Sequence, residues 1–573
     1  MEQNLPAAIF EAAKLYPDKP ALLKKVNGRW MPLTFAELTE HIRRCAAGLE
    51  RLGVRPGDRV GVLAWNGPAW VVADLGTMLI GGVVVPVHTS FSPELIRYVL
   101  DNSGVQVLVV SGRKLLERTL AIIDKLPFLR HVVLVDVAAP PSPPGVTMHA
   151  WEQLLQEPRL GQPVSLRRND PASIVYTSGT TGLPKGVVLT HGNFLSNMAA
   201  ALSAVPVYAE DILLSFLPLS HVLERTAGYY VPLSQGAEIA YAESPATLKE
   251  NLVEVRPTIL ISVPRIFEKF NDAIWVSVSS GPRFRKSLLT WALRQRKNSR
   301  LWIFADRLVF SKIRSSLGGR LRLTICGGAS LHVPLAKFFD RIGIRILEGY
   351  GLTETSPVIS VNTIPERRFG SVGLPLPGVV VRIAADKEIL VRGENICLGY
   401  WHDSDATAEL IDVDGFLHTG DLGFVDADGF LYITGRRKEM QVTSYGKNIW
   451  PTVAENAING DPLVSQTMVV AHGRPYVTAL IVPVWDELQR VADERGWKMD
   501  RAQLIGYPGV RELFKQRIRA ATTNLADHEQ VRRFTLLPQE FLAERDELTP
   551  TLKLRRSVIE RHHAVEIEAM YRQ

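Results

Sequence analysis

One short loop combines the residue types that bind a polyanion. The run from Tyr176 to Gly186 is YTSGTTGLPKG, which contains glycines, threonines, a serine and one lysine. Glycine lets backbone N–H groups approach an anion without an intervening Cβ, and the hydroxyls add further donors. The run is not a Walker A loop, because Lys185 precedes Gly186 and an apolar stretch instead of Ser or Thr and a helix. We predict that it holds phosphates, in preference to the ordinary alternative of a solvated turn.

Other stretches would suit the remainder of a nucleotide. They share a position at predicted strand ends or in glycine-containing turns, where ligands bind in open parallel sheets. They offer an imidazole, close backbone approach, an aromatic ring, carboxylates and a guanidinium. The stretches are Phe216–His221, Cys326–Ser330, Glu348–Glu354, Gly420–Asp421 and Gly435–Arg436. Each one alone has an ordinary structural explanation, such as a strand-end turn or a surface ion pair.

Alternating helix-like and strand-like segments carry these stretches. Thr34 is predicted to cap a helix that Gly53 ends, and a helix is predicted to begin near Ser92. All-apolar short strands separated by helices indicate a parallel sheet covered on both faces. The predicted strands are 59–63, 83–86, 105–110, 172–175, 186–189, 212–217, 239–241, 259–263, 322–326 and 345–348.

The predicted fold class is α/β with two domains, since 573 residues exceed one ordinary core. Residues 1–437 are expected to form a large N-terminal domain of parallel-rich sheets covered by helices. Its end, about 373–437, has short strands and turns typical of a small β-rich subdomain. Residues 438–573 are expected to form a small mobile α+β domain, with strands at 466–471 and 476–482 and helices at 452–459, 485–495 and 510–525.

Composition excludes several classes of protein. Hydrophobic residues at 46% and charged residues at 22% are typical of a soluble globular chain. Three widely spaced cysteines exclude a disulfide framework and favour a reducing compartment. The first twenty residues do not resemble a signal peptide, and the apolar stretch 75–87 is too short to span a bilayer. We therefore expect a cytoplasmic protein, and the net charge of +7 does not indicate a nucleic-acid partner.

The positive charge is concentrated between residues 283 and 320, where eleven Lys or Arg residues accompany a single acid, Asp306. Aromatic and aliphatic side chains alternate with them. Two interpretations stay open. The ordinary one, which we favour slightly, is a pair of surface helices that pack their apolar sides on the domain. The other is peripheral association with an anionic membrane, at its inner surface. A homodimer is also left open.

Together the motifs resemble those of the adenylate-forming, or AMP-binding, acyl-CoA synthetase superfamily. They are YTSGTTGLPKG at 176–186, EGYGLTET at 348–355 and HTGDLG at 418–423, and the resemblance extends from about residue 33 to residue 571. Local strings are similar to those of long-chain fatty acid–CoA ligases: LPLSHVLER at 217–225, the basic segment, and LTPTLKLRR at 548–556.

This resemblance implies a site for ATP and Mg²⁺. The phosphates would contact Thr177, Ser178, Gly179, Thr180, Thr181, Gly182 and Lys185. The adenine slot would consist of Gly328, Ala329, Glu348, Gly349 and Tyr350. Thr353 would contact the α-phosphate, Glu354 would ligate Mg²⁺, and Asp421 with Arg436 would bind the ribose. Lys553 would be the adenylation lysine, and His221 would lie at the mouth of the acyl tunnel.

The implied reaction has two steps. A long-chain fatty acid attacks ATP to give acyl-AMP and pyrophosphate, and CoA then displaces AMP. A rotation about the hinge Lys438 would bring Ser444 and Gly446 to the CoA channel. The family usually has Gly-Gly-Lys where this chain has Tyr445-Gly-Lys, which puts a tyrosine beside the expected CoA channel. The alternatives are an acyl-AMP ligase that loads a carrier protein, a luciferase-like oxidase, and a non-catalytic nucleotide- or lipid-binding protein.

Overall fold

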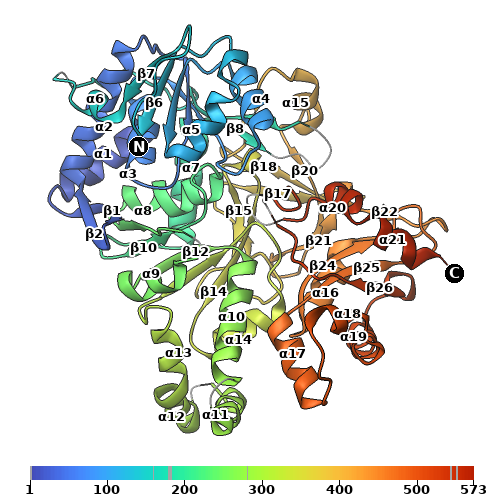
Figure 1. Ribbon diagram of the computed structural model, residues 1–573. Helices are drawn as coiled ribbons and strands as arrows, with labels where there is room; N and C mark the ends of the chain where they lie inside the picture. The colour runs from blue at the N-terminus through green and yellow to red at the C-terminus, as the bar shows by residue number, and fades with distance from the viewer. Residues whose placement is uncertain are drawn as a thin grey trace.

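The computed structural model describes residues 3–158, 160–177, 183–244, 246–279, 282–297, 299–542, 545–549 and 553–572. Two large sheets and their helices form the N-terminal part, and a smaller body of strands and helices follows it (Figure 1). The mixed α/β class is the one predicted from the sequence.

The first large sheet has eight strands in the described part of the chain, in the order β19-β9-β8-β4-β3-β5-β6-β7. Its strands from β4 to β7 pair in parallel, as predicted, whereas β8 pairs antiparallel with β9 and β9 with β19. The bounds are β3 Arg59–Leu63, β4 Val83–Pro86, β5 Val107–Ser111, β6 His131–Val135, β7 Thr147–Ala150, β8 Pro171–Thr177, β9 Lys185–Thr190 and β19 Gly399–Tyr400. The YTSGTTGLPKG run therefore connects two antiparallel neighbours.

Capped helices cover this sheet. The predicted cap at Thr34 is confirmed, because its hydroxyl accepts a hydrogen bond from the Glu37 N–H at 3.2 Å and its own N–H donates to Glu37. Ser92 caps the helix that follows it. The helices of this region are α1 Leu5–Leu15, α2 Phe35–Arg51, α3 Pro68–Leu79, α4 Pro93–Ser103, α5 Arg113–Leu120, α6 Trp151–Leu155 and α7 His191–Ala204.

The second large sheet runs in the order β16-β15-β14-β13-β12-β10-β11-β1-β2 across the residues described. Its centre is parallel, but the ends are antiparallel, at β1–β2 and from β14 to β16. Its strands are β1 Pro20–Val26, β2 Arg29–Thr34, β10 Ile212–Ser215, β11 Glu238–Tyr241, β12 Ile259–Ser262, β13 Leu323–Cys326, β14 Ile346–Gly351, β15 Val358–Val361 and β16 Leu374–Pro375. The β1–β2 hairpin was not predicted, because β1 joins the sheet by pairing with β11, which begins more than two hundred residues further along the chain.

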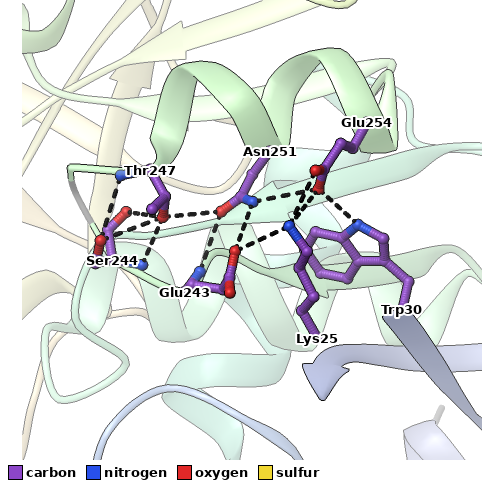
Figure 2. A network of polar contacts seen from close by, with 7 residues as sticks. All are labelled: Lys25, Trp30, Glu243, Ser244, Thr247, Asn251 and Glu254. Carbon is purple, nitrogen blue, oxygen red and sulfur yellow. Dashed lines mark hydrogen bonds and ion pairs between the residues drawn. The ribbon is translucent and has the colours of Figure 1, made fainter. Parts of the chain in front are cut away.

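Polar contacts fasten this N-terminal hairpin to the helix α9, Leu248–Val255 (Figure 2). The Lys25 ammonium lies 2.9 Å from Glu254 Oε2 and 3.1 Å from Glu243 Oε2. The Trp30 indole N–H donates to Glu254 Oε2 at 3.0 Å, and the Asn251 amide donates to Glu243 at 3.1 Å. One lysine shared by two carboxylates thus joins the hairpin to α9 and to the segment that follows β11.

The β-rich subdomain is an antiparallel sheet in the order β17-β18-β20-β21. Its strands are β17 Val380–Ile383, β18 Glu388–Arg392, β20 Leu417–Val425 and β21 Leu431–Arg436, with α15 Ser404–Leu410 before β20. Strand β20 runs through the whole HTGDLG motif at 418–423. Asp421 consequently lies opposite Arg436 on the neighbouring strand.

The C-terminal body has its own apolar core. Its three-stranded sheet consists of β24 Val464–Val470, β25 Thr478–Pro483 and β26 Arg533–Leu536, near the small pair β22 Gln441–Val442 and β23 Asn448–Ile449. The helices are α16 Pro451–Asn459, α17 Trp485–Glu494, α18 Arg501–Gly506, α19 Pro508–Ala521, α20 Arg556–His562 and α21 Ala564–Tyr571. The boundary between residues 437 and 438 stays a prediction.

The basic segment forms helices that extend below the second sheet in Figure 1: α11 Arg283–Arg294, α12 Arg300–Ala305, the π-turn η3 Asp306–Phe310 and α13 Ser311–Ser315. Phe310 is buried, and Trp291 and Trp302 pack against the same core. Phe284, Leu301 and Phe304 are instead more than half exposed, at 64%, 57% and 55%. The segment therefore has an inner apolar side that packs, as expected, and an outer one that does not. None of the helices described is both long and apolar enough to cross a membrane.

Candidate active site

A cavity of about 830 Å³ opens where the N-terminal sheets, the β-rich subdomain and the C-terminal body meet. This is within the usual size range of small-molecule sites. Its wall contains most of the residues predicted from the sequence: Thr177, Lys185, His221, Gly328, Gly349, Tyr350, Thr353, Glu354, Arg436, Lys438 and Lys553. Segments separated by almost four hundred residues thus line one space.

One wall is built from the ends of two parallel neighbours, β13 and β14. Gly327 and Gly328 follow β13, and Gly349 and Tyr350 continue β14. A Cβ on Gly327 would lie 3.2 Å from Leu223, and Gly328 has a φ of +83°, which favours glycine. The result is a narrow slot of bare backbone beside an aromatic ring, which suits a flat base.

Behind this slot, the Asp421 carboxylate accepts hydrogen bonds from two residues of the cavity wall. The Tyr350 hydroxyl donates to Asp421 Oδ2 at 2.7 Å, and Arg436 Nε donates to Oδ1 at 2.7 Å. Burial of the site, together with the Asp421 carboxylate, raises the pKa of Tyr350 well above its usual range. Asp421 is 6% exposed and is reached from the cavity through its two partners. The arrangement holds a carboxylate and a guanidinium at one end of the slot.

At the other side of the slot, a carboxylate faces a cation. Glu354 lies on the short helix η4, Thr353–Thr355, and accepts a hydrogen bond from the Tyr400 hydroxyl at 2.9 Å. The Lys185 ammonium lies 4.9 Å from the centre of the Tyr400 ring and 3.5 Å from Asp403 Oδ2. Strand β19 brings Tyr400 here by pairing with β9. Tyr400 therefore separates the two charged groups and orients both.

Lys553 enters the cavity from the C-terminal body. The Thr549 N–H donates to the Lys553 carbonyl at 2.8 Å, and a bridge between Leu548 and Leu554 closes the base of the turn. The side chain stays open to the water of the cavity although protein surrounds it. These surroundings lower the pKa of Lys553, as does Arg436, while Asp421 and nearby glutamates raise it. Its charge thus acts on the same groups that line the nucleotide-sized slot.

Two histidines stand where the polar part of the cavity gives way to its apolar part. Burial lowers the pKa of His221 to about 3 and that of His88 to about 4. His221 accepts a hydrogen bond from the Leu223 N–H at 3.3 Å, and His88 Nδ1 lies 2.7 Å from the Ser220 hydroxyl. Both rings are therefore neutral near pH 7, so His221 can hydrogen-bond a carboxylate but supplies no charge to it.

Beyond the histidines the lining is apolar. It comes from the end of α7, the π-turn η2 (Glu224–Tyr230), α8 (Val231–Ser234) and strands β12 and β13. The lining side chains are Ala201, Val205, Val207, Ala227, Val231, Ile259, Ile261 and Ile325. Such a wall accepts a hydrocarbon chain, because these lining side chains carry no polar group that would lose its hydrogen bond to water when the chain binds.

Several predicted residues lie elsewhere. Ala329 is exposed beside the slot, and Glu348 is buried behind it, where burial raises its pKa to about 7. Ser444 and Gly446 occupy an exposed turn outside the cavity lining. Ser178, Gly179, Thr180, Thr181 and Gly182 lie outside the described residues.

The sequence analysis missed Tyr400, Asp403 and Glu439. Tyr400 and Asp403 contact Glu354 and Lys185, and Glu439 lines the cavity beside Lys438. Nothing in the local sequence GYWHD or RRKEM marks them, since only the pairing of β19 with β9 and the position of the short helix η5, Arg437–Glu439, bring them to the site. No group of three or more His, Cys, Asp or Glu residues that could hold a metal by itself occurs in the part of the chain described.

Comparison with protein families gives two matches. Residues 9–401 match the family described as AMP-binding enzyme, and residues 439–573 match the AMP-binding enzyme C-terminal domain.

Curated relatives match the chain over nearly its whole length. The long-chain-fatty-acid–CoA ligase FadD15 of Mycobacterium tuberculosis is 34% identical, with 99% of this chain and 97% of the relative covered. The long-chain-fatty-acid–CoA ligase ACSBG2 of Rattus norvegicus is 31% identical over 99% and 93%.

Solved structures share the fold. The adenylation domain of a carboxylate reductase from Mycobacterium chelonae superposes with a TM-score of 0.82 at 21% identity, covering 99% of this chain and 91% of that one. ATP-bound MatB from Rhodopseudomonas palustris gives 0.73 at 22%, covering 98% and 99%. At these identities, the structural matches speak for the fold alone.

Proposed function

The chain belongs to the AMP-binding enzyme family, and we propose that it is a long-chain fatty acid–CoA ligase that forms acyl-AMP and then acyl-CoA. The observation that carries the proposal is a single cavity that contains a slot of bare backbone, the lysines Lys185 and Lys553, and an apolar extension. The slot suits the base of a nucleotide, the lysines suit its phosphates, and the apolar extension suits an acyl chain.

In the first step the fatty carboxylate attacks the α-phosphorus of ATP, the new P–O bond forms, and pyrophosphate leaves with the electrons of the broken bond. The adenine lies in the slot against Tyr350. The Asp421 carboxylate accepts hydrogen bonds from the ribose hydroxyls, and Arg436, which donates to the same carboxylate, supports it. Two anions must approach, so the Lys185 and Lys553 ammoniums neutralise the charge that moves between the phosphate oxygens. Thr353 donates to the α-phosphate. The neutral His221 holds the carboxylate at the mouth of the apolar extension.

Glu354 would hold Mg²⁺, and the phosphates of the substrate would complete the ion's coordination. One carboxylate suits this ion, because Mg²⁺ is usually bound through one or two carboxylates plus substrate phosphates and waters. When bound, the ion supplies further positive charge at the phosphate oxygens. The hydrogen bond from Tyr400 leaves the second oxygen of Glu354 available for this role.

In the second step the CoA thiolate attacks the acyl carbonyl and AMP leaves. We propose that the C-terminal body turns about Lys438 between the steps, which would withdraw Lys553 and bring Ser444 and Gly446 to the cavity. Tyr445 between them is 75% exposed, so it is free to stack on or narrow the path of CoA.

The acyl substrate is a long hydrocarbon chain, since the cavity extension is formed by aliphatic side chains from α7, α8 and the neighbouring strands β12 and β13 of the second sheet. A panel of carboxylates of increasing length, assayed for acyl-CoA with ATP and CoA, tests the proposal. Acyl-CoA formed from long chains supports it. Acyl-AMP that accumulates without thioester points to the acyl-AMP ligase alternative, and the absence of pyrophosphate release points to a binding protein.

We also propose that the outer apolar side of α11 and α12 docks on an anionic bilayer. Phe284, Leu301 and Phe304 are exposed there, and the same two helices carry several basic residues. Aromatic side chains insert at the headgroup boundary while Lys and Arg attract acidic lipids. A protein whose substrate dissolves in membranes would collect it at such a surface.

A further inference from the structure

Arg265 connects the two bodies of the molecule through contacts that do not involve the proposed hinge, Lys438. It lies at the start of α10, Pro264–Ser279, in the N-terminal part and is 18% exposed. Its Nη1 donates to the Ser465 carbonyl at 2.8 Å and its Nη2 to the Ser465 hydroxyl at 2.9 Å. Its Nη2 also lies 3.4 Å from Glu540 Oε1. Within its own body, Arg265 pairs with Glu268 at 3.1 Å.

The two partners in the C-terminal body belong to one unit. The Ser465 hydroxyl donates to Glu540 Oε1 at 2.8 Å. Next to them, the Phe541 N–H donates to Gln466 Oε1 at 2.7 Å, and this ties the 540 loop to β24. Phe541 packs in the same apolar cluster as Leu548 and Leu554, the two residues that close the turn carrying Lys553. Whatever positions Ser465 and Glu540 therefore positions Lys553 as well.

A second contact at the same interface is possible only because residue 460 is a glycine. The His332 ring packs so closely on Gly460 that a Cβ there would lie 2.2 Å from His332 Cε1. Gly460 has a φ of −71° and a ψ of −9°, which any residue adopts. The backbone at Gly460 therefore does not require glycine, but the close contact with His332 does. Burial lowers the pKa of His332, which favours the uncharged ring at this contact.

We infer that Arg265, Ser465 and Glu540, with His332 against Gly460, form a latch that selects the orientation in which Lys553 reaches the cavity. Arg265 and the others of this set are positioning residues, because none of them lines the cavity. The inference rests on the proposed two-step function. The latch would assist acyl-AMP formation and would have to open before CoA reacts.

The charges around Arg265 strengthen this dependence. Glu268 and Asp272 face it from its own helix, and Glu540 faces it from the other body. Glu487 of that body adds a negative charge close to Asp272. Burial raises the pKa of Asp272 to about 6, and Glu487 adds to this effect. Without the guanidinium, these carboxylates would face one another across the interface and repel. Arg265 therefore contributes attraction and also cancels a repulsion.

The test compares the two half-reactions. Arg265→Ala should lower fatty-acid-dependent pyrophosphate exchange by about tenfold, since hydrogen bonds to a charged group are lost. Thioester formation from supplied acyl-AMP should stay at the wild-type rate or rise. Gly460→Ala should likewise lower pyrophosphate exchange and leave thioester formation unchanged. Adding His332→Ala to Gly460→Ala should restore exchange, because it removes the clash with the new Cβ. Lys269→Ala, which removes an exposed cation from the same helix, is the matched control and should change neither step.

A direct measurement of orientation accompanies the assay. The cysteines of this chain are all buried, so spin labels can be placed selectively at Lys249→Cys on α9 and Lys515→Cys on α19, both exposed. The label distances should broaden or shift in Arg265→Ala and Gly460→Ala. Distances that stay as in the wild type, or an equal loss of both half-reactions, would overturn the latch. A wild-type protein without pyrophosphate exchange would contradict the proposed function instead, and the distances would still test the latch.

Discussion

Glu224 is a carboxylic acid buried beside the acyl wall, and its removal should change how stability depends on pH. It lies at the start of the π-turn η2, between Leu223 and Arg225, and is 1% exposed. Its Oε2 has no hydrogen-bond partner among the residues described. Burial raises the pKa of Glu224 from 4.5 to about 8, against a smaller opposite effect of the Ser215 hydroxyl. The side chain is therefore mostly protonated at pH 7.

The direction of the pH dependence follows from the protonation of Glu224 in the folded and the unfolded chain. Below pH 4.5 the carboxyl is protonated in the folded and the unfolded chain alike and costs nothing. Between pH 4.5 and about 8, the unfolded chain releases the proton while the folded chain retains it, so stability falls as pH rises. At 1.36 kcal/mol per pH unit, the loss between about pH 5 and pH 8 is about 3–4 kcal/mol, after which it levels off.

Glu224→Gln keeps the shape of the neutral acid and cannot ionise. The variant should therefore gain stability over the wild type as pH rises, by about 3–4 kcal/mol from about pH 5 to pH 8. Urea unfolding followed by tryptophan fluorescence at several pH values measures the difference. Glu250→Gln, an exposed carboxylate on α9, is the matched control and should leave the pH profile unchanged. A stability difference between wild type and Glu224→Gln that does not vary with pH would refute the reasoning.

Four further outcomes can be measured. Lys553→Ala should lower the rate of pyrophosphate exchange by about 10²–10³-fold, the loss seen when other charge-stabilising donors are removed. Thioester formation from supplied acyl-AMP should stay intact. Equal loss of both steps would contradict the role of Lys553 as the adenylation lysine. Asp421→Ala removes the acceptor of Tyr350 and Arg436, so the KM for ATP should rise about tenfold or more, and an unchanged KM counts against the ribose site. Ala227→Phe should shorten the preferred acyl chain, with about 1–3 kcal/mol of discrimination per excluded methylene, and an unaltered chain-length profile would mean that the chain runs elsewhere. Replacing Arg285, Lys286 and Arg294 by Gln should lower the affinity for anionic vesicles, measured by flotation, by about 100-fold, at about 1 kcal/mol per charge. Binding to neutral vesicles serves as the control. Lys297 is left in place because it pairs with Asp340 at 2.9 Å.

Local patterns predicted much of the fold. The cap at Thr34, the apolar strand Val83–Pro86 and the helix beginning after Ser92 are encoded by residues within a few positions of one another. What failed were features that depend on partners remote in the chain. The β1–β2 hairpin joins β11 far downstream, and strand β20 extends to Val425 because it pairs with both β18 and β21.

The sequence by itself determined the kinds of chemistry at the site. Glycines that admit a base, lysines that neutralise phosphates and a carboxylate for a metal are properties of residue types, so they could be recognised in the motifs. Only the tertiary structure decided which of them meet. Tyr400 reaches Glu354 because β19 pairs with β9, and Lys553 reaches the cavity because Arg265 and Gly460 allow the C-terminal body to seat there. Hydrogen bonds and close packing act over a few ångströms in space, and separation along the chain carries no information about them.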